Sequence, residues 1–155
     1  MRLALALTTA AALLAAGAAL ALPSESAGPQ AARKDGLPLY VNGYTKWPKL
    51  NARPIVGGSA AHVGVKQVYA SKRKRGARFP VGTIVVKTAR PAGAKWLSLV
   101  ATMRRIQGRQ NGGWRWEEFT RSSASQRFRR VAFGESGCAA CHLQAQATDY
   151  VFTRR

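Results

Sequence analysis

Apolar and polar positions alternate along four stretches in the middle of the chain, each rich in Val, Ile, Thr or aromatic residues. The stretches are residues 63–69, 83–88, 96–104 and 114–119. A period of two is typical of β-strands, because successive side chains of a strand point to opposite faces of a sheet. Asn111-Gly112-Gly113 forms a strong hairpin turn before the last stretch. Four strands joined by short turns predict an antiparallel sheet.

Helical patterns lie outside this region. Residues 122–133 have spaced apolar positions and predict a helix, and residues 141–147 predict a second helix near the C-terminus. Residues 44–50 fit either a short helix or an irregular turn around Trp47-Pro48. The expected fold class is therefore α+β, a mainly antiparallel β-sheet with a few packed helices.

The N-terminus has the three parts of a secretory signal peptide. Arg2 supplies a positive charge, an Ala/Leu run extends from Leu3 to Leu22, and Ala19-Leu20-Ala21 is a small-x-small cleavage site. We expect residues 1–21 to be removed and the rest of the chain to be exported to a bacterial periplasm. An uncleaved membrane anchor is the alternative, because the run is just long enough to span a bilayer.

Two further segments complete the expected organisation. Residues 22–38 are rich in Pro, Ser, Ala and Gly without periodicity, and they predict a flexible leader. Residues 39–155 are then expected to form one folded domain, since a chain of 155 residues is too short for a large multidomain enzyme.

Composition excludes several classes of site. The chain has 25 Lys and Arg against 6 Asp and Glu, for a net charge of +19, yet 46% of its residues are hydrophobic, too many for a disordered polyelectrolyte. Two cysteines exclude a disulfide-dense scaffold and a four-thiolate zinc or iron–sulfur site. So few carboxylates argue against a calcium or two-metal site.

Cys138-Ala139-Ala140-Cys141-His142 has the C-x-x-C-H spacing of c-type haem attachment. Thiols three residues apart on one helical turn can reach both vinyl groups of a porphyrin, and the adjacent His142 can bind the iron as proximal ligand. The motif predicts one covalent haem c per chain, carried by a C-terminal helix. A structural disulfide or a thioredoxin-like redox pair are the alternatives, but neither explains His142.

The other side of the iron has no obvious ligand. No Met follows His142, and Met103 is the only Met besides Met1. An electron-transfer cytochrome c needs a Met or a His opposite the proximal histidine. A helical cytochrome c′ also carries a C-terminal motif, but the β pattern argues against a four-helix bundle. The sequence therefore predicts a five-coordinate iron that is open to a small molecule.

From about residue 44 to the C-terminus the chain resembles the cytochrome P-460 family. The matching segments, in the family's order, are residues 46–51, His62 ahead of Val68-Tyr69, residues 79–87, Gly113-Trp114, residues 138–142 and residues 149–153. The most specific of them are Gly82-Thr83-Ile84-Val85-Val86-Lys87 and the pairing of the Cys-x-x-Cys-His motif with Asp149-Tyr150-Val151-Phe152-Thr153.

The resemblance implies a mainly antiparallel β fold with a c-type haem against the sheet, a homodimer, and one of two activities. Cytochromes P-460 proper oxidise hydroxylamine with a haem that carries an additional covalent bond from a Lys. The related cytochromes c′-beta lack that bond and bind nitric oxide or carbon monoxide. A simple periplasmic electron carrier is a third reading.

Lys87 aligns with the cross-linking Lys of this family. An unpaired ammonium at the end of a buried β-branched run is costly, and a bond to the porphyrin edge would remove its charge. Alternatively, Lys87 extends to solvent or pairs with a haem propionate. Thr88 stands where the family often has Glu.

An oxidase also needs a base that takes protons from its substrate, and the candidates are His62, Glu117, Glu118 and Glu135. His62 lies near where relatives place a distal-pocket residue, although it fits a loop histidine equally. Glu135 lies close to Cys138 but could simply cap the following turn. Glu117 and Glu118 are adjacent on a strand, so at most one of them faces the pocket.

The basic residues gather in one loop and several pairs. The loop at residues 71–78 carries five positive charges, and Arg104-Arg105, Arg129-Arg130 and Arg154-Arg155 add others. Export argues against nucleic acid as the partner. An acidic periplasmic redox partner or an anionic membrane surface is favoured, with a merely solvated loop as the alternative.

Overall fold

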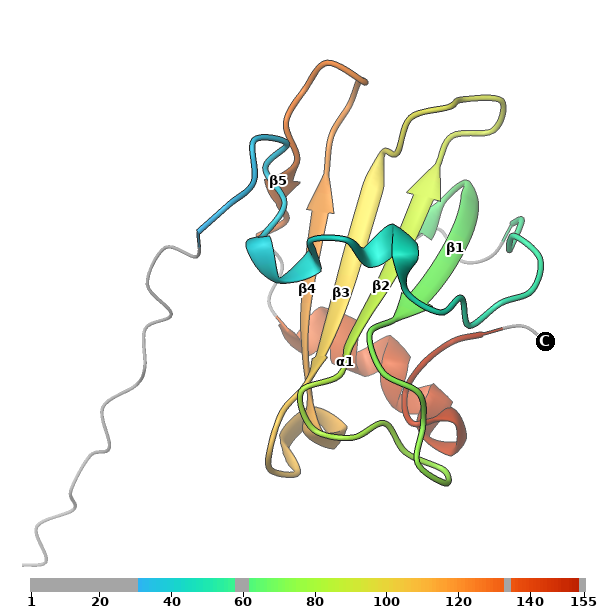
Figure 1. The fold of residues 1–155 in the computed structure, drawn as a ribbon, viewed down its shortest axis with the longest axis vertical. Coiled ribbons are helices and arrows are strands. Elements are labelled where there is room, and N and C mark those ends of the chain that lie inside the picture. The colour runs from blue at the N-terminus through green and yellow to red at the C-terminus, as the bar shows by residue number, and fades with distance from the viewer. Residues whose placement is uncertain (1–30, 58–61, 133–134, 154–155) are drawn as a thin grey trace, which may run out of the picture.

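A computed structural model describes residues 31–57, 62–132 and 135–153. Its centre is a five-stranded antiparallel sheet in which neighbouring strands also follow one another along the chain (Figure 1). The strands are β1 (Val65–Ala70), β2 (Ile84–Arg90), β3 (Leu99–Arg105), β4 (Trp114–Thr120) and β5 (Arg129–Arg130). The four alternating stretches thus form β1 to β4, and the predicted antiparallel sheet is confirmed.

Short helical elements lie on both sides of this sheet. The single turns η1 (Leu39–Val41) and η2 (Tyr44–Lys46) cross one face, whereas α1 (Glu135–His142) and η5 (Leu143–Thr148) lie behind the other (Figure 1). A further turn, η4 (Gln110–Gly113), leads into β4. The C-terminal helix therefore exists but begins six residues before Cys141. Within the described ranges, no helix has the length and hydrophobicity to cross a membrane.

Each face of the sheet is covered by an apolar layer. One layer joins Val85, Met103 and Trp116 to Ala139 of α1, and its remaining members come from the strands, the C-terminal segment and Phe79 in the loop before β2. The other joins Val86 and neighbouring strand residues to the N-terminal segment. Burial on both faces explains why apolar residues stand at consecutive positions such as Val85-Val86. In a sheet with one face in water, apolar and polar residues would alternate along each strand.

The folded part of the chain begins nearer the N-terminus than the composition predicted. Leu37 is only 2% exposed and belongs to the second apolar layer. The carbonyl of Asp35 accepts a hydrogen bond from the Phe128 N–H at 2.8 Å. The prediction of a flexible leader is therefore wrong for residues 31–38, because Leu37 is needed to fill the core. Residues 1–30, including the expected signal peptide, lie outside the described part of the chain.

The helix predicted for residues 122–133 is not found over residues 122–132, and Phe133 lies outside the described residues. A turn occupies residues 122–127, where the Arg121 guanidinium donates to the carbonyls of Ala124 and Gln126. Arg129 and Arg130 then pair with β4 as β5. Tertiary contacts decide the outcome here, since Phe128 is buried in the second apolar layer and draws the chain against the sheet edge.

The other edge of the sheet is covered by residues 48–55. The N–H groups of Leu50 and Ile55 donate to the carbonyls of Val68 and Lys66 on β1. Between them the buried Asn51 accepts the Val68 N–H through Oδ1 at 2.7 Å and donates to the Arg53 carbonyl through Nδ2 at 2.7 Å. A single amide side chain thus satisfies backbone groups of both segments.

Replacing Asn51 by Ala should destabilise the protein by about 1–3 kcal/mol, because a buried N–H is left without its acceptor. The free energy of unfolding in urea measures this loss. Asn42→Ala, at an exposed position, is the matched control and should change stability by less than about 0.5 kcal/mol. Equal losses in the two variants would contradict the role assigned to Asn51.

Candidate functional site

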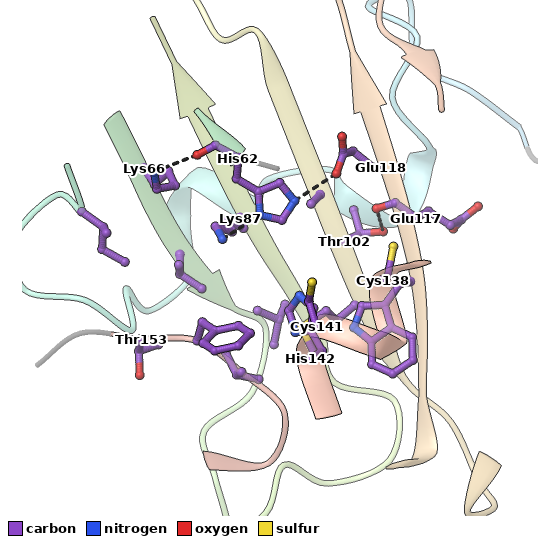
Figure 2. A pocket seen from close by; sticks show the side chains of 18 of the residues that line it. His62, Lys66, Lys87, Thr102, Glu117, Glu118, Cys138, Cys141, His142 and Thr153 are labelled. Carbon is purple, nitrogen blue, oxygen red and sulfur yellow. Dashed lines mark hydrogen bonds and ion pairs between the residues drawn. The ribbon is translucent and has the colours of Figure 1, made fainter. Parts of the chain in front are cut away.

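A cavity of about 390 Å³ lies between one face of the sheet and the C-terminal segment (Figure 2). The strand register places Lys87 of β2 opposite Ala101 of β3, and Ala101 opposite Glu118 of β4. Directly paired residues share a face of the sheet, so these three form one row across it. In the adjacent row Val85, Met103 and Trp116 form an apolar wall of the same cavity.

Helix α1 brings the Cys-x-x-Cys-His motif to this cavity. Cys138, Cys141 and His142 all line it, and both cysteines carry free thiols. The His142 ring packs against Trp116 and Phe152, with ring centroids 5.8 and 5.2 Å apart respectively. The helix thus delivers two thiols and one imidazole to the apolar wall.

The hydrogen bond of His142 determines which ring nitrogen is free. Its Nδ1 lies 2.6 Å from the Tyr150 carbonyl oxygen, which can only accept, so Nδ1 carries the proton and Nε2 keeps its lone pair. Burial lowers the pKa of His142 below its ordinary value, although the bond to Tyr150 opposes this shift. His142 is therefore a neutral imidazole at pH 7, the form in which histidine binds a metal.

The environment of the two thiols argues against a redox-active dithiol. Burial raises the pKa of Cys138, and the charges of Glu118 and Glu135 raise it further. A reactive dithiol needs a cysteine whose pKa is lowered. Two free thiols on one helical turn, a neutral imidazole with Nε2 available and an apolar wall together fit a c-type haem.

Three polar side chains form a hydrogen-bonded chain on the sheet wall of the cavity. His62 Nδ1 lies 2.8 Å from Lys87 Nζ, and His62 Nε2 lies 3.0 Å from Glu118 Oε2 (Figure 2). Ala101 separates Lys87 from Glu118 on the sheet, and its small side chain leaves room for the His62 ring. A carboxylate accepts and an ammonium donates, so the consistent arrangement is a donation from Lys87 to His62 and from His62 to Glu118.

Lys87 is held in a partly neutral state. Burial lowers its pKa from the ordinary 10.5 to about 8, the charge of Lys66 lowers it further, and Glu118 acts in the opposite direction. Above pH 8 the amine is therefore mainly uncharged, and an uncharged amine is a nucleophile.

Lys66 holds the backbone at His62 and Gly64, although no sequence motif identified this residue. Its buried ammonium donates to the carbonyls of His62 at 2.8 Å and Gly64 at 3.0 Å, and also to that of Gly57. Because the His62 and Gly64 carbonyls both bind this ammonium, the backbone at His62 is held beside β1. One sequence signal could have identified Lys66. It stands on the same face of the strand as Val68 and Ala70, where an apolar residue is expected.

The remaining carboxylate candidates point elsewhere. Glu117 faces the opposite side of the sheet from Glu118, as adjacent strand residues must, and accepts a hydrogen bond from the Tyr40 hydroxyl at 2.6 Å. It also pairs with Arg130 at 3.2 Å. Glu135 stands in the first turn of α1 and pairs with Arg115 at 3.4 Å, away from the His62 chain.

Comparison with known families agrees with this geometry. The cytochrome P-460 family model matches residues 41–153, which include every strand, Lys87 and the Cys-x-x-Cys-His motif. The chain belongs to the cytochrome P-460 family. No curated protein matches it. Membership of the family supports a cytochrome whose cofactor is an iron-containing haem.

The pKa of Lys87 can be measured by ¹³C NMR of lysine Cε atoms in protein produced without haem attachment. We expect one lysine to titrate with a midpoint of about 8, whereas lysines in model peptides titrate at about 10.4. Glu118→Gln should lower this midpoint by removing a negative charge, and Lys66→Met should raise it by removing a positive one. Glu117→Gln, on the other face, is the control and should leave it in place.

Proposed function

We propose that this cytochrome P-460 family member is an exported c-type haem protein that oxidises hydroxylamine or a related small nitrogen compound. The observation that carries the proposal is the His62–Glu118 pair, which faces the same cavity as the Nε2 atom of His142. A base beside the iron ligand suits a reaction that releases protons. A protein that only binds gas has no need of a base.

The attachment residues follow from the donor set. Cys138 and Cys141 would hold the haem through thioether bonds, and His142 would bind its iron through Nε2. A haem held there supplies an iron that can bind a small nitrogen compound and receive its electrons. The apolar wall of Val85, Met103 and Trp116 limits the access of water to that side of the cavity.

Glu118 and His62 would take the protons. Each pair of electrons removed from hydroxylamine is accompanied by the release of a pair of protons, and the electrons leave to an acceptor protein. Glu118 holds His62 through Oε2, and among the described residues its Oε1 atom makes no hydrogen bond. We assign Oε1 as the proton acceptor. The linked His62 shares the proton and orients the carboxylate, as in other acid–base pairs.

Lys87 is the proposed site of the porphyrin cross-link. Its amine lies in the cavity wall, and its pKa of about 8 makes the nucleophilic form accessible near neutral pH. The rival role is an ion pair with a haem propionate. A bond to the ring would remove the charge and change the electronic properties of the macrocycle.

Gas binding without turnover is the second candidate. It is favoured by the apolar cavity lining, to which Val68, Val85 and Met103 contribute, and by Thr88 in place of the family's frequent Glu. A cytochrome c′-beta-like protein would hold nitric oxide or carbon monoxide there and would need no base. A plain electron carrier would instead need a second strong ligand on the iron.

The electron acceptor is proposed to be an acidic periplasmic protein. Residues 72–78 are exposed and contain all five basic residues of the loop, so they present a dense positive surface. Lys74 donates to the Thr148 carbonyl at 3.0 Å, which connects this loop to the segment that follows the haem-binding helix. Charge complementarity would steer an acidic partner toward it.

A homodimer, implied by the family resemblance, is also proposed, and no nucleic acid partner is expected.

The spectrum of the ferrous protein tests the role of Lys87. After acid–acetone extraction, the mass of the chain should still include one haem. If the amine is bonded to the ring, the Soret band should lie well to the red of an ordinary c haem, and Lys87→Ala and Lys87→Arg should both restore the ordinary position.

An ordinary spectrum in the unaltered protein, with tight nitric oxide binding and no turnover, would instead establish the gas-binding function. A low-spin spectrum with a methionine–iron band would support the electron carrier. A chain without haem mass, from a host able to attach haem, would overturn the whole proposal.

Substitutions of the proton acceptor test the reaction itself. Glu118→Gln and His62→Ala should each lower kcat for hydroxylamine oxidation by about 10²–10⁴ per haem. The double variant should lose little more than the worse single one, because the two groups act as a unit. Glu117→Gln makes the same chemical change on the opposite face and should retain turnover. Equal rates in Glu118→Gln and Glu117→Gln would exclude Glu118 as the base.

A further inference from the structure

Asp149 is a buried carboxylate that the proposed reaction does not use. Its side chain is 2% exposed, Oδ2 accepts the Phe79 N–H at 2.7 Å, and Oδ1 lies 3.4 Å from Arg105 Nη1. Phe79 precedes β2 and Arg105 ends β3. One carboxylate therefore ties the C-terminal segment to the loop before β2 and to the end of β3.

The backbone at this point adopts a rare conformation. Asp149 has φ 57° and ψ 44°, and Tyr150 has φ 66°, so two successive residues other than glycine are left-handed. L-residues avoid this region unless surrounding contacts hold them there. The N–H of Tyr150 donates to the Ala145 carbonyl at 2.8 Å, which closes the turn after η5.

This turn aims one carbonyl at the imidazole of His142. The Tyr150 carbonyl accepts the Nδ1–H at 2.6 Å, and the Tyr150 ring lies against Gly112, where an added Cβ would collide with it. Arg105 donates to the Gly112 carbonyl at 2.5 Å as well as pairing with Asp149. Arg105 thus contacts the turn directly at Asp149. It also binds Gly112, against which the Tyr150 ring packs.

We propose that Asp149 is a positioning residue for His142, because it stabilises the left-handed turn that presents the Tyr150 carbonyl to Nδ1. The inference rests on the proposed function, in which His142 binds the haem iron. A hydrogen bond from Nδ1–H makes the imidazole more basic and fixes its orientation. Asp149 thereby strengthens the iron–histidine bond and lowers the reduction potential of the iron.

Two substitutions separate the contributions of the carboxylate. Asp149→Asn retains an oxygen for the Phe79 N–H but loses the ion pair with Arg105. Asp149→Ala loses both contacts. Asp35→Asn is the matched control, because Asp35 also accepts a backbone N–H, that of Leu37 at 3.1 Å, and pairs with an arginine, Arg33 at 2.8 Å. Its segment lies on the other face of the sheet.

The iron–histidine stretching band in the resonance Raman spectrum of the ferrous holoprotein, with the reduction potential, is the readout. Asp149→Ala should shift the band to lower frequency and raise the potential, Asp149→Asn should do both to a smaller extent, and Asp35→Asn should do neither. A merely structural role would lower the melting temperature without moving band or potential.

Wild-type band position and potential in both Asp149 variants would overturn the inference. If Asp149→Ala does not accumulate with haem, the comparison of Asp149→Asn with Asp35→Asn decides it. Absence of an iron–histidine band in the unaltered protein would overturn both this inference and the assignment of His142 as ligand. A band that is present but unmoved would overturn the positioning role alone.

Discussion

The antiparallel register of β2, β3 and β4 is the constraint on which the site depends. It places Lys87, Ala101 and Glu118 in one row on one face of the sheet. A slip of one residue would turn every side chain of a strand to the opposite face. Such a slip of β4 would turn the Glu117 carboxylate toward the cavity in place of that of Glu118, and a slip of β2 would remove Val86 from the second apolar layer. Because both faces are buried, the same packing that stabilises the fold fixes the chemistry of the site.

The buried charged groups of the described residues have different partners, and the partner decides what each group can do. Lys66 donates to the backbone carbonyls of His62 and Gly64, so it anchors the chain at His62. The hydrogen-bonding partner of Lys87 is the His62 imidazole, and burial favours the uncharged form of the amine. Asp149 pairs with Arg105 and holds the C-terminal segment in place. Lys87 thus lies beside an imidazole and a carboxylate, while Lys66 and Asp149 hold backbone segments in place.

The cavity is assembled from segments that are far apart in the sequence. His62 lies ahead of the first strand, and His142 lies after the last, yet both line the same space. The sheet alone could not bring them together. The N-terminal segment covers one face (Figure 1), so the C-terminal segment and His62 share the other (Figure 2). The division of the two ends of the chain between the two faces therefore creates a cavity that both histidines line.

The sequence determined strands β1 to β4, their antiparallel pairing and the Cys-x-x-Cys-His motif, because each depends on local spacing. Alternation with a period of two identifies a strand without reference to its partners, and C-x-x-C-H places two thiols and an imidazole on one helical turn. The adjacency of Glu117 and Glu118 likewise dictated that they face opposite sides of the sheet.

Contacts between distant segments decided the rest. The apolar spacing of residues 122–132 matched a helix, but burial of Phe128 and pairing with β4 made the segment a turn and a short strand. The sequence also could not choose among four candidate bases, because that choice depends on which of them meets Lys87. Only the tertiary structure links Lys87, His62 and Glu118, since their hydrogen bonds join residues 25 and 56 positions apart. Local patterns carry no information about such distances.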